Sequence, residues 1–349
     1  MPEPHFETLA ETAIAGDALT REQALSVLES SDEDLLALLH AAYRVRRERR
    51  GSKVHVHRLS NVKSGLCPED CHYCAQSKIS TAGIQTYGMW KDDQFLQEAQ
   101  RAKDLDARRY CMALSGRGPT NREIDNLCRV ISRIKREVGI DTCLSIGLLK
   151  ADQAERLKQA GLDRLNHNLN TSERHYPKIC TTHTYADRVA TLANAQDAGL
   201  ELCSGGIVGQ GEANDDVVDM LFHLREIEPH SVPLNFLIPI EGTPFENIDS
   251  GLTPRYCLKV LALARFLLPA ADVRVAGGRE VNLRSLQPMA LYPANSVFVE
   301  GYLTTDGQLA SETAAMIEDL GFEVEIEPAD TENPAEQPAE TGDTAAQPA

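Results

Sequence analysis

The sequence predicts a (β/α)8 TIM-type barrel with an N-terminal helical extension and a disordered acidic C-terminal tail. From residue 53 onward, short β-rich runs alternate with helical patterns, which is typical of a parallel sheet with right-handed crossovers. The alternation repeats eight times, and eight is the number of strands that closes a barrel. The length of 349 residues suits one large α/β domain with extensions. A doubly wound open sheet is the alternative.

Each unit of the barrel pairs an expected strand with an expected helix. The strands are expected near residues 56–63, 107–114, 141–147, 162–168, 200–208, 232–238, 272–277 and 295–300. The helices are expected near residues 92–104, 121–138, 150–160, 185–199, 214–226, 254–268, 280–291 and 309–320. We therefore expect the barrel to cover residues 53–322, preceded by a helical extension over residues 1–52. In that extension, a capping run from Ser30 to Asp34 precedes an apolar stripe at helical spacing.

The net charge of −17 lies mostly at the two ends of the chain. Residues 323–349 hold eight acids and no base, which predicts a low-complexity tail that is disordered from residue 328. The acidity argues against a nucleic-acid partner, since phosphate binding relies on Lys and Arg. The basic run RVRRERR, residues 44–50, is typical of a solvated helix end, with an anion site as the alternative. Without a long apolar run or a basic leader, we expect a cytoplasmic protein that does not span a membrane.

The run GLCPEDCHYC places Cys67, Cys71 and Cys74 directly after the first expected strand. This is the carboxyl end of the barrel, where such folds place their chemistry. Three thiolates can bind three irons of a 4Fe-4S cluster and leave the fourth iron open to another ligand. Zinc is an alternative, but it needs a second cysteine pair or His72, which sits inside the run. Purely structural cysteines are a further alternative.

The pattern CxxxCx(aromatic)C, completed by Tyr73, resembles the signature of the radical S-adenosylmethionine (SAM) enzymes. The resemblance implies that the open iron binds the amine and carboxylate of SAM, and that Tyr73 lies near the adenine. It further implies that an electron from the cluster cleaves SAM to a 5′-deoxyadenosyl radical, which abstracts hydrogen from carbon. No side-chain general base is expected, because a hydrogen atom is removed and the chemistry belongs to the cofactor.

Three further cysteines, Cys111, Cys143 and Cys203, each lie within an expected strand. If all three point inward they converge inside the barrel, and three soft ligands in a closed cavity suggest a second metal centre. The alternative is that each packs as a small buried hydrophobe.

From about residue 50 to 322 the chain resembles the biotin synthase family. The matching stretches are SGLCPEDCHYCAQS, YCM, LNHNLNTS, CSGGIVGQGE, VPLNFL, EGTP, VRVAGGRE and YLTTDG. The resemblance implies that Cys111, Cys143, Cys203 and Arg274 hold a 2Fe-2S cluster, and Arg274 is assigned on this ground alone. It also implies that the 2Fe-2S cluster donates sulfur to dethiobiotin, that a flavodoxin or ferredoxin supplies electrons, and that the chain forms a homodimer.

The same resemblance assigns residues to SAM and to the substrate. For SAM these are Tyr73, Asn168, Asn170, Arg188, Gly205, Ile207 and Gly209, where the last three belong to a GxIxGxxE pattern ending at Glu212. For dethiobiotin they are Asn168, Asn235, Thr304 and Thr305. The amide of Asn235 can both donate to and accept from a ureido ring. The threonine pair can bind a carboxylate, or it can cap the helix that follows. The best-known form of the family motif has Asp at the position of Asn170.

Two other functions remain open at this point. One is a related radical SAM enzyme that acts on another small molecule. The other is a non-catalytic iron–sulfur protein, which would not cleave SAM after reduction. Outside the two sites, the alternating pair His55 and His57 could bind a metal or occupy ordinary polar strand positions. Arg109 lies two residues before Cys111, on the same expected strand face, and could neighbour the second cluster.

Overall fold

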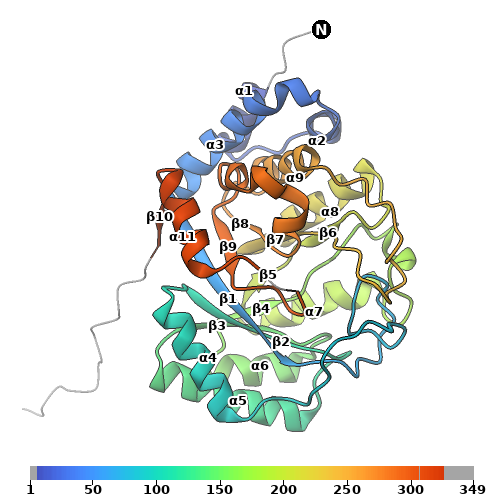
Figure 1. Ribbon diagram of the computed structural model, residues 1–349, viewed down its shortest axis with the longest axis vertical. Coiled ribbons are helices and arrows are strands. Elements are labelled where there is room, and N and C mark those ends of the chain that lie inside the picture. Colours follow the sequence, from blue (N-terminus) through green and yellow to red (C-terminus); the bar gives the residue numbers. More distant parts are fainter. Residues whose placement is uncertain (1–5, 306, 326–349) are drawn as a thin grey trace, which may run out of the picture.

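The computed structural model describes residues 6–305 and 307–325, and among these residues eight parallel strand positions close into a barrel (Figure 1). The closure is made by β1, which pairs in parallel with β2 on one side and with β9 on the other. Helices connect successive strands, as right-handed crossovers require. The predicted TIM-type barrel is therefore confirmed.

The strands lie close to their expected positions. Their bounds are Lys53–Lys63 (β1), Arg109–Leu114 (β2), Asp141–Ser145 (β3), Arg164–Asn166 (β4), Glu201–Cys203 (β5), Gly206–Val208 (β6), Ser231–Phe236 (β7), Asp272–Val275 (β8) and Ser296–Val299 (β9). The strand expected at 200–208 is split into β5 and β6, and both halves pair with β7. The split lies opposite Pro233, which has no N–H to donate to a neighbouring strand.

The crossover helices also follow the expected pattern. They are Asp92–Asp104 (α4), Asn121–Glu137 (α5), Ala151–Gln159 (α6), Tyr185–Asp197 (α7), Asn214–Ile227 (α8), Pro254–Leu267 (α9), Arg279–Leu283 (α10) and Ala310–Asp319 (α11). The helix expected at 280–291 ends early as α10, and a 3-10 helix, Arg284–Leu291 (η3), continues it. The break falls at Arg284, whose φ is 53°, and Pro288 inside η3 cannot donate an α-helical hydrogen bond.

The N-terminal extension consists of three helices, Phe6–Ala15 (α1), Arg21–Leu28 (α2) and Leu35–Arg50 (α3), which pack beside α9 (Figure 1). Arg46 of α3 is fully buried. Its guanidinium donates to the carbonyls of Leu291 and Lys53 and lies 4.1 Å from the ring centroid of Phe322. The expectation of a solvated helix end is therefore wrong for Arg46, because backbone carbonyls and an aromatic face replace its water.

The structure differs from the sequence expectation where the acidic tail was expected to begin. Glu323–Val324 form a short strand, β10, which pairs in parallel with the start of β1. The backbone N–H of Glu325 also donates to the carbonyl of Val54 at 3.0 Å, so the barrel edge orders this part of the tail. The disorder predicted from residue 328 concerns residues outside the described ones. Along the described chain, none of the helices is long and apolar enough to cross a membrane.

Candidate functional site

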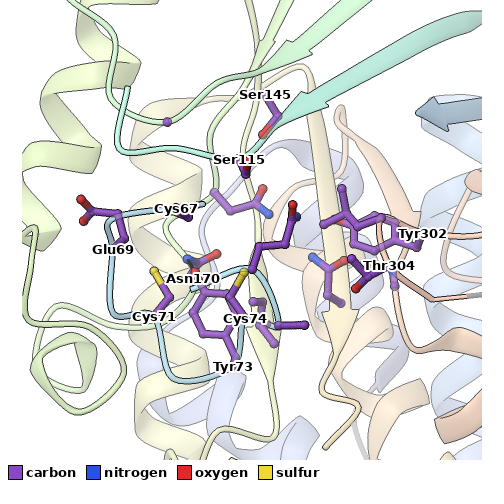
Figure 2. Close-up of a pocket in the computed structure, with 18 of the residues that line it drawn as sticks. Cys67, Glu69, Cys71, Tyr73, Cys74, Ser115, Ser145, Asn170, Tyr302 and Thr304 are labelled. Carbon is purple, nitrogen blue, oxygen red and sulfur yellow. Dashed lines mark hydrogen bonds between the residues drawn. The ribbon is translucent and has the colours of Figure 1, made fainter. Parts of the chain in front are cut away.

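A cavity of about 290 Å³ opens at the carboxyl ends of the barrel strands (Figure 2). Most of the residues assigned to the first cluster, SAM and substrate line it: Cys67, Cys71, Tyr73, Cys74, Asn168, Asn170, Arg188, Ile207, Asn235, Thr304 and Thr305. Gly205 and Gly209 are absent from its lining. Residues that lie far apart in the sequence therefore meet in one cavity.

The three cysteines of the first motif lie on the irregular loop that follows β1. Figure 2 shows their side chains along one side of the cavity, with Tyr302 and Thr304 on the other. The start of the loop is fixed to its surroundings, because the N–H of Gly65 donates to Gln76 at 3.1 Å and its carbonyl accepts from Ser115 at 2.6 Å. His72 packs edge-on against Phe245, with ring centroids 5.5 Å apart, and does not line the cavity. This arrangement disfavours a zinc site that uses His72 as the fourth ligand.

Tyr73 and Asn170 form a hydrogen-bonded pair in the cavity wall. The side-chain amide of Asn170 donates to the Tyr73 hydroxyl at 2.6 Å. Burial raises the pKa of Tyr73 well above its ordinary value, so the hydroxyl remains protonated. Asn170 has a φ of 73°, in the left-handed region that Asn tolerates better than most residues. Its backbone bonds to Gly205 and Ile207, which joins the asparagine segment to the β5–β6 segment.

Arg188 of α7 lines the same cavity, next to the asparagine segment. It donates to the carbonyl of Asn168 at 2.8 Å and to Nε2 of His183 at 3.0 Å. It also donates to the hydroxyl of Tyr176, so the guanidinium is held by three neutral acceptors. Because none of these acceptors is a carboxylate, the positive charge remains available to an anionic group in the cavity.

The glycines of the GxIxGxxE pattern shape the wall and do not line it. A Cβ on Gly205 would lie 1.9 Å from the carbonyl oxygen of Pro233, so only glycine fits there. Gly209 has a φ of 100°, and its N–H donates to Glu212 at 2.6 Å. The second oxygen of Glu212 accepts from the N–H of Gln210, also at 2.6 Å. Glu212 therefore caps a tight turn.

Three residues assigned to the substrate, Asn235, Thr304 and Thr305, line the same cavity. The amide of Asn235 donates to the carbonyl of Gly206 at 3.0 Å and accepts from the N–H of Gly277 at 2.9 Å. Thr305 closes a tight turn by donating its hydroxyl to the carbonyl of Tyr302 at 2.8 Å. The helix α11 begins only at Ala310, after Leu309, so the threonine pair does not cap it.

The three strand cysteines converge inside the barrel. Cys111 of β2 pairs in register with Cys143 of β3, and Cys203 of β5 completes a buried group that is flanked by Leu59 and Phe298. Cys111 and Cys143 line a second cavity, of about 110 Å³. Both cavities share lining residues, namely Gln76, Leu114, Ser145, Asn166, Tyr302 and Leu303. The strand cysteines therefore lie next to the larger cavity, deeper in the barrel.

Arg274 of β8 lies beside these thiols, with Nη1 3.8 Å from the sulfur of Cys203. Its Nε donates to Ser296 at 2.9 Å, and its Nη2 donates to Nε2 of His57 at 2.9 Å. Burial and the charge of Arg274 hold the pKa of His57 well below its ordinary value, so His57 is a neutral acceptor. His57 and Ser296 thus orient a guanidinium that is 1% exposed.

The thiols of the second site shift one another's pKa values. The contact with Cys143 lowers the pKa of Cys111, while the pKa of Cys143 is raised to about 12. Contact with Cys143 and burial raise the pKa of Cys203 well above its ordinary value. Arg109, expected to neighbour this site, donates to Asp141 at 2.9 Å and contributes positive charge near Cys143.

Sequence reasoning did not single out His57, Ser296 or Tyr302 as parts of this site. His57 had a visible signal, since it alternates with His55 on one strand, but its partner is an arginine 217 residues away. Ser296 and Tyr302 are residue types without a distinctive pattern, so only the closed barrel brings them to the thiols. These three residues connect the second site to β1 and to the segment around β9.

A parallel barrel with three motif cysteines at the carboxyl end of its first strand defines a radical SAM enzyme, and the Radical SAM superfamily model matches residues 61–224. The Biotin and Thiamin Synthesis associated domain matches residues 233–323. Biotin synthase from Rhodopirellula baltica is 50% identical over 323 residues, which cover 93% of this chain and 90% of the relative. The chain belongs to the biotin synthase family, and it is a radical SAM enzyme that inserts sulfur.

Other relatives support the same family, and two solved structures support the fold. Biotin synthases from Geobacillus kaustophilus and Bacillus subtilis strain 168 are each 51% identical, covering 92% and 91% of this chain and 96% and 94% of their own. Among solved structures, a methylornithine synthase has a TM-score of 0.80 at 19% identity and covers 91% of this chain and 97% of its own. The FeFe-hydrogenase maturase of Carboxydothermus hydrogenoformans has a TM-score of 0.79 at 18% identity, with 94% and 81% covered. Both structures support the fold.

Enzymes of this family use SAM, a 4Fe-4S cluster and a second, 2Fe-2S cluster. The donor sets of the two cavities fit these groups. The first cavity offers three free thiols and wide adjoining space, as a cluster with one open iron and a bound cosubstrate requires. The second cavity is smaller, and it or the buried cysteine group beside it offers three free thiols and a guanidinium.

Proposed function

We propose that the chain inserts sulfur into dethiobiotin with two sites, one in each cavity. In the larger cavity Cys67, Cys71 and Cys74 hold the 4Fe-4S cluster, next to SAM and dethiobiotin. In the smaller cavity a second group of four side chains holds the 2Fe-2S cluster: Cys111, Cys143, Cys203 and Arg274. The observation that carries this proposal is the convergence of these four buried side chains behind a wall that both cavities share.

When bound, the clusters supply the electron that cleaves SAM and the sulfur that enters the product. The chain supplies position and protection from water. Leu59 and Phe298 line the second cavity and pack against the three strand cysteines, which are at most 5% exposed. A buried, apolar surrounding of this kind keeps water and other reactants away from a radical.

SAM is held, in this proposal, by the wall that contains Tyr73 and Asn170. The guanidinium of Arg188 pairs with the carboxylate of the methionine group, because its present acceptors are all neutral. Asn168 and Asn170 offer amide groups to the ribose. The aromatic ring of Tyr73, the backbone at Ile207, and the wall shaped by Gly205 and Gly209 enclose the adenine.

Dethiobiotin lies between SAM and the second cavity. Asn235 and Asn168 line the same cavity and offer amide groups to the ureido ring. Thr304 and Thr305 offer hydroxyl and backbone donors to the carboxylate at the other end of the substrate. In this orientation the carbons that lose hydrogen face the smaller cavity and its thiols. Tyr302 lies at this boundary, because it lines both cavities.

The electron for SAM cleavage comes from a separate redox protein, such as a flavodoxin or ferredoxin, and the chain acts as a homodimer. Both statements rest on the family resemblance. Sedimentation of the reconstituted protein tests the dimer, and a monomer at working concentrations would contradict it.

The experiment that tests the two-site assignment compares Cys143→Ala with wild type. Both proteins are reconstituted anaerobically with iron and sulfide, then reduced in the presence of SAM and dethiobiotin. We expect the variant to keep SAM cleavage to 5′-deoxyadenosine, because Cys143 does not line the larger cavity, and to make no biotin. Cys128→Ala is a matched control, since Cys128 lies on α5 outside both cavities.

Two results would contradict the proposal. Full biotin yield from Cys143→Ala would show that the strand thiols hold no sulfur donor. Formation of 5′-deoxyadenosine without biotin by the wild-type protein would assign the chain to a related radical SAM enzyme that acts on another small molecule.

A further inference from the structure

A second group of metal-ligating side chains lies directly behind the first cysteine loop. Cys180 follows the 3-10 helix Tyr176–Lys178 (η2), and His183 comes three residues later, before α7. The sulfur of Cys180 lies 3.8 Å from the sulfur of Cys71 and 3.3 Å from Nδ1 of His183. Ligand atoms of the three residues all lie within 4.8 Å of one another, and all three residues are buried. The proposed function uses only Cys71 of this group.

The two separations that involve Cys180 fit one tetrahedral ion. A zinc ion with bonds of about 2.3 Å to sulfur and about 2.0 Å to nitrogen places two sulfur ligands about 3.8 Å apart. The same geometry places sulfur and nitrogen ligands about 3.5 Å apart. The observed values of 3.8 Å between Cys71 and Cys180, and 3.3 Å between Cys180 and His183, match both separations. Three protein ligands leave the fourth position to water.

We propose that the cluster-free protein binds one soft divalent metal ion, such as zinc, through Cys71, Cys180 and His183. Because Cys71 would serve both metals, this ion and the 4Fe-4S cluster exclude each other. The exclusion rests on the proposed role of Cys71 as a cluster ligand, whereas the divalent site itself does not depend on it.

The charges around the group suit a cation. Glu69 contacts Nδ1 of His183, and Asp70 accepts from the Cys180 thiol at 3.3 Å. Because an arginine can only donate, Nε2 of His183 is now the acceptor and the ring proton lies on Nδ1, so metal binding through Nδ1 transfers this proton to Nε2. Arg188, which now donates to Nε2 at 3.0 Å, must move away. Binding therefore releases the two thiol protons of Cys71 and Cys180 and competes with one contact of Arg188.

The test uses Co²⁺ as a spectroscopic probe on the full-length, cluster-free protein, under anaerobic conditions with a phosphine reductant. All proteins carry Cys143→Ala, so that the strand thiols do not bind the probe. We expect sulfur-to-cobalt charge-transfer absorption and the intense ligand-field bands of tetrahedral cobalt. Cys180→Ala and His183→Ala should each weaken cobalt binding by on the order of a hundredfold or more, since even outer-shell changes cost tenfold to a hundredfold. Cys257→Ala, at a buried cysteine of α9, should leave binding unchanged.

Two variants then separate this site from the cluster site. Cys67→Ala should keep the cobalt spectrum and fail to assemble the 4Fe-4S cluster. Cys180→Ala should do the reverse, and it should assemble the cluster even with one equivalent of zinc present, where the parent protein is inhibited. Cluster assembly by Cys180→Ala also shows that this variant is folded.

Cobalt binding that needs Cys67 and tolerates Cys180→Ala would overturn the divalent site and leave the proposed function intact. Conversely, cobalt binding by a parent protein that itself never assembles the 4Fe-4S cluster would overturn the proposed function and leave the divalent site intact. Zinc that leaves cluster assembly by the parent protein unaffected would overturn the exclusion.

Discussion

The side chains of both sites are held mainly by neutral hydrogen-bond partners. Arg188 donates to two oxygens and an imidazole, and Arg274 donates to Ser296 and a neutral His57. A buried guanidinium without a carboxylate partner keeps a strong attraction for an added anion. Both arginines are therefore oriented by the chain while their charge stays available to what binds in the cavities.

Asn170 shows how a single backbone angle constrains residue choice. At a φ of 73° glycine and asparagine are well tolerated, and a β-branched residue is strained. We expect Asn170→Gly to lower the free energy of unfolding by about 1 kcal/mol, the value of the lost hydrogen bond to Tyr73. Asn170→Val should lower it by about 2 to 3 kcal/mol, because left-handed strain adds to that loss.

Denaturant unfolding of the cluster-free proteins measures this difference, with the exposed Asn247→Val as control. Equal effects of the Gly and Val variants would mean that the backbone angle at this position is not what limits residue choice.

At the scale of the elements, the backbones of the strands approach closely where β5 and β6 pair with β7. The Cβ that Gly205→Ala would add points at the Pro233 carbonyl, a backbone group that cannot turn away. We expect this variant to lose about 3 kcal/mol of folding free energy, as overpacked sites do. Gly83→Ala is the control, since a Cβ there would meet nothing within 4 Å.

Urea unfolding of both cluster-free variants checks this prediction. Because Cys203 lies two residues before Gly205, Gly205→Ala should also lower the yield of the 2Fe-2S cluster. A Gly205→Ala protein as stable as the Gly83→Ala control would show that β7 can shift to make room.

Element positions could be predicted well from the sequence, because hydrophobic period and turn residues act locally. The α4 helix appears where the pattern placed it, over 92–104. Breaks inside elements could not be predicted, since the β5–β6 split depends on Pro233 of another strand. For the same reason Cys111, Cys143 and Cys203 were visible candidates, whereas His57 and Ser296 became partners of Arg274 only through barrel closure.

At the scale of the whole molecule, the free energy of unfolding depends on pH, because some groups bind protons differently in the folded and the unfolded chain. Burial holds the pKa of His57 and of His167 well below 6.5 in the fold, so both are neutral there. In the unfolded chain each binds a proton as the pH falls below about 6.5. Above about pH 6.5 neither histidine therefore lowers the free energy of unfolding. Below that pH, each histidine should lower the free energy of unfolding by up to about 1.4 kcal/mol per pH unit.

Urea unfolding of the cluster-free protein from about pH 7.5 to about pH 5.5 measures this slope, in a window above the titration of ordinary carboxyls. His167→Gln should reduce the slope, while His40→Gln, at an exposed position, should not. If His167→Gln leaves the slope unchanged, His167 is not one of the histidines that bind a proton on unfolding.

The closure of the barrel through β1 and β9 orders events during synthesis. The ribosome releases the three motif cysteines first and the three strand cysteines next, and Arg274 and β9 emerge only after them. Until Ser296–Val299 is free to pair with β1, the second cavity lacks its last wall and its thiols stay exposed to solvent. The deeper site can therefore be loaded only after β9 has been synthesised. A nascent chain that stalls before Arg274 has exposed strand cysteines and lacks the fourth side chain of the site.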